Sequence, residues 1–214
     1  NASGEAATHG SLIGTEAFFS DLGGTTPMSG NEDLTIPGSD LYVQDDEGVT
    51  SLAIEGGAMA TIDIDGIEKG GQDLGSFSFT FCTAEEAAAQ GIEHFGSTMN
   101  DFVAFLENIM GLDDTDVNGQ SLGGSAMVNT NGSIIIFGNE GTVQDLEIET
   151  YDFSVSYLGT PAGEPVTNPF SFTETEDADG ESVRTSFVAY DSLGTAVTID
   201  VTMVLQETLD GQGT

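Results

Sequence analysis

The chain has 214 residues, of which 37 are acidic and only two, Lys69 and Arg184, are basic, so its formal net charge is −35. This charge excludes nucleic acids and anionic membrane surfaces as partners, because both are recognised through clustered lysine and arginine. Apolar residues make up 38% of the chain, which is enough to build a core in one or two domains.

The first part of the chain predicts several short strands separated by glycine, aspartate and asparagine. Residues 3–50 are loosely patterned, and a short apolar run follows at 51–54. Alternation of apolar and polar residues predicts half-buried strands over 58–66 and 74–82. Cys82 is the single cysteine, so no disulfide forms within the chain, and we expect it to be a small buried apolar residue.

One long amphipathic helix is predicted over residues 98–110. Its apolar positions recur at helical spacing, and they are Met99, Phe102, Val103, Leu106, Ile109 and Met110. Thr98 is a good N-cap, and Asp101 stands where a capping box has its acidic residue. A shorter helix with a threonine cap is predicted over 83–90. We expect the long helix to cover a strand over 134–137.

A hairpin and a longer strand are predicted after this helix. The hairpin turns at 129–132, where an Asn-Gly pair gives a strong short-range signal. Alternating apolar residues predict one continuous strand over 145–157. The segment 160–165 contains two prolines and a glycine, so it is the best candidate for a linker.

The last predicted element is a second hairpin over residues 183–204. Both of its strands carry apolar residues at every second position, which predicts one buried face and one face toward solvent. Asp191 and Ser192 favour a turn, and Gly194 tolerates a positive φ. The whole pattern predicts a mainly β fold with one amphipathic helix.

We predict two domains on either side of the linker. Residues 1–160 form a β-rich domain that contains the helix, and residues 161–214 form a partial β domain that ends in the hairpin.

Two segments of the second domain carry a family resemblance. The string Tyr190-Asp191-Ser192-Leu193-Gly194 resembles the YDSLG hairpin of bacterial flagellar hook proteins. Asn168-Pro169-Phe170-Ser171-Phe172 resembles the Pro-Phe segment upstream of it, so the resemblance covers roughly 165–205, about a fifth of the chain. Residues 131–141 also look like a glycine-rich strand motif of flagellins and hook-associated proteins.

The resemblance implies a structural protein without catalytic or cofactor-binding residues. A hook is a flexible extracellular joint that transmits torque, built from copies of one subunit in a helical filament and joined to other hook-associated proteins. The chain is then an outer, surface-facing fragment of the subunit, with 3–160 as an expanded insertion and without the family's terminal helices. Hook subunits are exported to the flagellum without a cleaved signal peptide.

The charge places one condition on such a filament. Because subunits of this charge repel one another, we expect a packed polymer to need salt or bound cations, and we infer a saline source.

The only cofactor that the sequence predicts is calcium. Asp114, Asp116 and Asn118 form the first half of an EF-hand-like loop, with Gly119 at its sixth position. Position twelve is Ser125 where a bidentate glutamate is expected, so an acidic loop without a metal remains the alternative interpretation.

An enzyme is not predicted. The string Gly119-Gln120-Ser121-Leu122-Gly123 fits a nucleophile elbow, but no histidine follows it, since His9 and His94 are the only two. A hydrolase with paired carboxylates is the remaining enzymatic alternative. The main alternative to a hook subunit is an acidic extracellular adhesin or surface-layer module, stabilised by calcium.

Overall fold

The computed structural model describes residues 6–45, 47–112 and 123–205, together with the backbone of 116–117 and 120–121. It is mainly β, with two α-helices in the described residues, which confirms the predicted fold class. Neither helix is long and apolar enough to cross a membrane.

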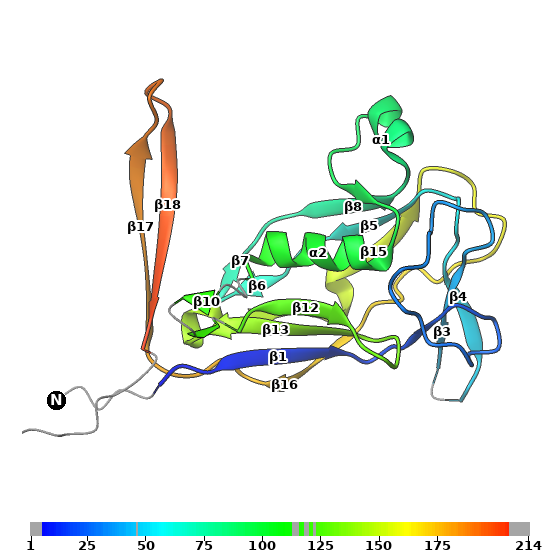
Figure 1. The fold of residues 1–214 in the computed structure, drawn as a ribbon, viewed down its shortest axis with the longest axis horizontal. Coiled ribbons are helices and arrows are strands. Elements are labelled where there is room, and N and C mark those ends of the chain that lie inside the picture. The colour runs from blue at the N-terminus through cyan, green and yellow to red at the C-terminus, as the bar shows by residue number, and fades with distance from the viewer. Residues whose placement is uncertain (1–5, 46, 113–115, 118–119, 122, 206–214) are drawn as a thin grey trace, which may run out of the picture.

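Two four-stranded sheets form the body of the molecule (Figure 1). The first is antiparallel and contains, in spatial order, β12 (Ser125–Val128), β13 (Ile134–Glu140), β1 (His9–Gly14) and β16 (Phe172–Glu176). The second contains β15 (Phe153–Tyr157), β5 (Ala60–Ile64), β8 (Phe77–Phe81) and β9 (Phe95–Gly96), of which β9 runs parallel to β8. β12 and β13 form the hairpin that the Asn-Gly pair predicts.

Smaller sheets flank this body. One contains β2 (Phe18–Phe19), β3 (Leu41–Gln44) and β4 (Thr50–Ile54), and another contains β14 (Leu146–Glu147), β6 (Glu68–Lys69) and β7 (Gln72–Asp73). Two strand pairs complete the described set, β10 (Asp116–Val117) with β11 (Gln120–Ser121), and β17 (Ser182–Tyr190) with β18 (Ala196–Val204).

Both predicted helices form where their caps indicate. The helix α2 (Met99–Met110) begins after Thr98, whose side chain accepts from the Asp101 amide while the Asp101 carboxylate accepts from the Thr98 amide. The shorter α1 (Ala84–Gln90) has the same reciprocal arrangement between Thr83 and Glu86. Each box satisfies backbone amides that a helix start leaves without partners, so these starts are fixed by local sequence.

The apolar face of α2 packs between the two four-stranded sheets. Phe102 is fully buried and its ring lies 5.5 Å from that of Phe79 on β8. On the other side α2 lies along β12, where the Glu107 carboxylate accepts from the Ala126 amide at 2.8 Å. The strand nearest to the helix is β12, the hairpin partner of the strand at 134–137 that it was expected to cover, and Ile134 and Ile136 are buried in the same core as the apolar face of α2.

The phenylalanine rings of the core meet at Phe170, in the loop before β16. Its ring lies 5.3 to 5.6 Å from those of Phe18, Phe102 and Phe153. These three belong to β2, α2 and β15, so one side chain from residue 170 joins two sheets and the helix. Phe170 is 2% exposed, and burial of an aromatic ring of this size is a large apolar contribution.

This packing corrects the predicted division at 160–165. β16 pairs with β1 along four residue pairs, and Phe170 and Phe172 lie in the main core. Residues up to 176 therefore fold with the first block, and the β17–β18 pair projects from it. The proline-rich segment is a surface loop, whose Ala162 and Gly163 amides donate to the carboxylate of Glu55.

The predicted strand over 145–157 is also corrected. It is interrupted by a 3-10 turn at Thr150–Asp152, which separates β14 from β15. The Asp152 carboxylate accepts from the Glu149 amide at 2.7 Å, which closes this turn. The apolar positions change phase at this turn, from even numbers at Leu146 and Ile148 to odd numbers at Tyr151 and Phe153. The sequence therefore carries a sign of the break, which the prediction of one continuous strand passed over.

The buried cation Lys69 secures the end of α2. Its ammonium donates to the carbonyl oxygens of Met110 at 2.7 Å and Gly111 at 3.2 Å. The side-chain amide of Asn139 also donates to the Gly111 carbonyl oxygen, with 2.8 Å between nitrogen and oxygen. These donors satisfy carbonyl groups that a helix end leaves unpaired, and a cation there also complements the helix dipole.

Lys69 gives the stability of the fold a defined pH dependence. Burial, with a smaller contribution from the charge of Arg184, lowers the pKa of Lys69 from 10.5 to about 8. Between these two pH values the unfolded chain keeps a proton on Lys69 that the folded chain has released. The contribution of this group to stability therefore rises with pH over that window.

Comparison with Lys69→Met tests this assignment. We expect the wild type to gain stability relative to the variant between pH 7.5 and pH 10, by up to about 3 kcal/mol. Urea unfolding followed by circular dichroism at both pH values measures the difference. Parallel stability profiles for the two proteins would contradict a lowered pKa at Lys69.

Replacing the ring of Phe170 tests the arrangement of the core. We expect Phe170→Ala to destabilise the protein by about 3–5 kcal/mol, because it removes a ring that touches three elements. Phe187→Ala is the control, since Phe187 is 52% exposed, and it should change stability by less than about 0.5 kcal/mol. Hydrogen exchange of the α2 amides reports on the stability of residues 1–160. If that exchange is unchanged in Phe170→Ala, the predicted domain boundary at 160 stands.

Candidate functional site

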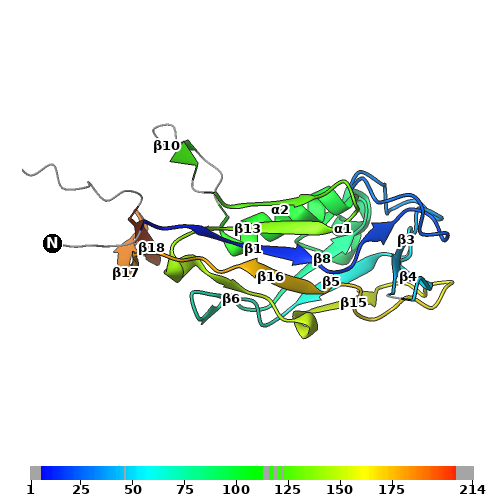
Figure 2. The same cartoon turned by 90° about the horizontal axis from the view of Figure 1, so that it is seen from below.

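The β17–β18 pair is a two-stranded ribbon that projects from one end of the body (Figures 1 and 2). Its base is fastened by hydrogen bonds. The Val143 amide donates to the Ser182 hydroxyl at 3.0 Å, the Leu205 amide to the Glu181 carbonyl at 2.9 Å, and the Ala7 amide to the Leu205 carbonyl at 2.7 Å. The ribbon is therefore anchored at its base and extends away from both four-stranded sheets.

The hook-like string lies at the tip of the ribbon. The Asp191 carboxylate accepts from the amides of Leu193 and Thr195, each at 2.8 Å, and Gly194 adopts a φ of +82°. The Gly194 amide donates to the Asp191 carbonyl at 3.0 Å. These amide donors, first that of Thr195 and then that of Leu193, hold the pKa of the Asp191 carboxyl below its usual range. Asp191 and Gly194 thus have the turn roles that the sequence predicts.

The two faces of the ribbon differ in composition. On one face of the ribbon, Phe187 of β17 lies opposite Ile199 of β18. The same face holds three further cross-strand pairs, which are Val183–Met203, Thr185–Val201 and Ala189–Val197. Seven of these eight side chains are apolar. The opposite face is mixed: Val188, Ala196 and Val204 lie there beside hydroxyl groups and the ion pair between Arg184 and Asp200, with 3.5 Å between nitrogen and oxygen.

The apolar face is exposed, which corrects the prediction that it is buried. Phe187 and Met203 are 52% and 57% exposed, and no described residue covers this face. The alternation in the sequence indicates which residues share a face, but only a packed neighbour buries that face. An isolated two-stranded ribbon is marginally stable in water, so this surface is our candidate functional site.

The predicted calcium loop lies mostly outside the described residues. Asp114 and Asn118 are not described, and of Asp116 only the backbone is described, where it begins β10. Among the side chains that the structure describes, no group of three or more His, Cys, Asp or Glu is arranged to hold a metal ion. Calcium binding at this loop therefore stays a prediction.

Carboxylates crowd together on the small sheet that contains β6. Asp73, Glu68 and Glu147 are directly opposite one another across its three strands. Like charges in such positions destabilise a sheet. Burial raises the pKa of the nearby Asp152, and the negative charge of Asp65 is the largest of the neighbouring charges that raise it further. One carboxylate oxygen of Asp152 is buried without a hydrogen-bond partner among the described residues.

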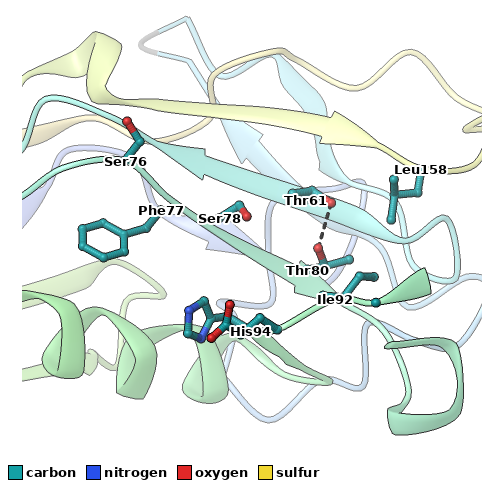
Figure 3. A pocket seen from close by; sticks show the side chains of 10 residues that line it. Thr61, Ser76, Phe77, Ser78, Thr80, Ile92, His94 and Leu158 are labelled. Carbon is teal, nitrogen blue, oxygen red and sulfur yellow. Dashed lines mark hydrogen bonds between the residues drawn. The ribbon is translucent and has the colours of Figure 1, made fainter. Parts of the chain in front are cut away.

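The possible catalytic residues do not come together in the described structure. Ser121 lies in β11, where only its backbone is described. His94 borders a hollow of about 460 Å³ (Figure 3), and its ring packs 5.0 Å from that of Phe105. In this hollow the hydroxyls of Thr61 and Thr80 lie 2.9 Å apart and hydrogen-bond to each other.

The hollow of Figure 3 also shows what sequence analysis missed. Its hydroxyl groups come from β5, β8 and the segment before β8, and only strand pairing brings them together.

Cys82 is buried as predicted, and burial raises the pKa of its thiol, with a smaller effect of the Glu86 charge.

Comparison with known proteins adds no assignment, because no protein-family model, curated protein or solved structure matches this chain.

Substituting Asp191 tests the role of the turn. We expect Asp191→Ala to speed hydrogen exchange of ribbon amides near the tip several-fold, since two amides lose their acceptor. Asp191→Asn is the matched control, because its side-chain oxygen can accept the same two hydrogen bonds. In the wild type the Asp191 carboxylate stabilises the turn at pH values above the usual pKa of aspartate. This stabilisation is lost as the pH falls through the lowered pKa of Asp191. Equal exchange in both variants would contradict this role.

Proposed function

We propose that this chain is a surface-exposed part of a structural subunit of the bacterial flagellar hook, an extracellular filament that acts as a flexible joint. The observation that carries the proposal is the position of Tyr190–Gly194, which close the tip of a projecting ribbon and have turn-forming hydrogen bonds. The residues that resemble the hairpin of hook proteins thus form the turn of a hairpin in this chain as well. The proposal assigns the chain no catalytic step.

The surface chemistry suits a joint that bends. Outer parts of neighbouring subunits must slide past one another, which requires contacts that are polar, modest and reversible. A surface with 37 acidic residues in the whole chain opposes tight adhesion between crowded neighbours. The body of the protein would supply this repulsive surface, while salt or bound cations would limit the repulsion within the polymer.

The partners in this proposal are copies of the same chain and other hook-associated proteins. Nucleic acids and membranes have no part in it, and the location is the extracellular hook and basal body of the flagellum.

The adhesin or surface-layer alternative is supported by a different observation. The carboxylates that crowd around Glu68 have no neutralising lysine or arginine on their face, since Lys69 points to the end of α2 and Arg184 pairs with Asp200. Oxygen-rich surfaces of this kind are typical of proteins that calcium stabilises. The two proposals differ in where the protein is found on the cell.

Localisation distinguishes the two. We expect antibodies raised against this chain, with immunogold electron microscopy of the source cells, to label the short curved segment between the cell body and the flagellar filament. Preimmune serum and cells that lack flagella are the controls.

Uniform labelling of the cell envelope would contradict the hook proposal and favour the adhesin. In that case a rise in the melting temperature with millimolar calcium, absent with equal ionic strength of sodium chloride, would identify the cation.

A further inference from the structure

We propose that the apolar face of the β17–β18 ribbon is an interface between two copies of this chain, packed face to face with the ribbons antiparallel. The inference deepens the proposed function, on which it rests for its setting, by naming the surface through which copies meet. Its evidence lies in the ribbon itself.

The distribution of charge favours a second copy as the occupant. Residues 182–204 contain one basic and two acidic residues, so the ribbon has a net charge of −1, and the remainder of the chain carries −34. The net charge of the body makes two bodies repel each other when two copies approach. The ribbon projects from that body, so two copies can touch through it with little repulsion.

The length of the ribbon decides the orientation. Nine residues per strand correspond to about 30 Å, whereas the Debye length is about 10 Å at 0.1 M salt. In an antiparallel pair the base of one ribbon lies at the tip of the other, so the two acidic bodies are held about three Debye lengths apart. A parallel pair would place both bodies side by side, and their repulsion disfavours it.

Nothing on the ribbon opposes association with a like ribbon. Its nine residue pairs are in continuous register without a bulge, and residues 182–204 contain no proline or lysine. The face that carries Phe187 therefore has no bulge to interrupt it and no charged side chain on it. Of the two faces, the one with Phe187 carries seven apolar side chains in four successive cross-strand pairs, and so it gains most from leaving water.

The area of the face sets the strength of the contact. A ribbon about 30 Å long and about 10 Å wide presents about 300 Å² on one face, so two copies bury about 600 Å². A stable complex buries at least about 1,200 Å², so the pair is weak and reversible. Such a contact matches a polymer in which each subunit makes several weak contacts.

Sedimentation equilibrium of the whole chain, from micromolar to millimolar concentration and at low and high sodium chloride, tests the inference. We expect a monomer at low concentration and a dimer at high concentration, with association strengthened by salt. Phe187→Thr should weaken association at least tenfold. Val188→Thr is the matched control, because Val188 is 56% exposed beside Phe187 but lies on the opposite face, and it should associate as the wild type does.

Hydrogen exchange locates the contact independently of the variants. Amides of β17 and β18 should become more protected as concentration rises, while those of α1 remain unchanged. A chain that stays monomeric at millimolar concentration and high salt, equal loss in both variants, or protection that rises elsewhere would overturn the inference. None of these results bears on the immunogold test, so the hook proposal and this interface fail separately.

Discussion

The packing around Phe170 holds the rest of the structure together. This single ring contacts rings from β2, α2 and β15, and the strand that follows it, β16, pairs with β1 near the beginning of the chain. The loop that contains Phe170 thus closes the body by joining elements more than 150 residues apart. Without this contact α2 would still have its caps, but its apolar face would lack one of the groups that bury it.

Electrostatics limits what can surround this core. Lys69 is buried at the end of α2 and Arg184 pairs with Asp200 on the ribbon, so neither neutralises the acidic surface of the body. Repulsion therefore grows with every copy brought close, and it is balanced by salt and by apolar contact. The projecting ribbon combines low charge with an exposed apolar face, and in both respects it differs from the body.

Local signals and long-range packing were predictable to different degrees. The caps at Thr83 and Thr98 are formed within one turn of helix, so the sequence located both helix starts. The turn at Asp191 was predictable for the same reason. The break at Asp152 was missed, because the residues on each side of it alternate by themselves and only a shift of the apolar positions from even to odd numbers marks it. The candidate interface was visible only as an alternating pattern, which every half-buried strand shares.

The sequence by itself determined the mainly β class, the helix boundaries, the two hairpins and the side of the ribbon on which Phe187 lies. Each of these depends on residues within a few positions of one another, through hydrogen bonds and the period of two or 3.6 residues. Tertiary structure alone decided that Phe170 belongs to the main core and that the face of Phe187 is exposed. Both depend on which distant element lies opposite a side chain, and a local pattern carries no information about that neighbour.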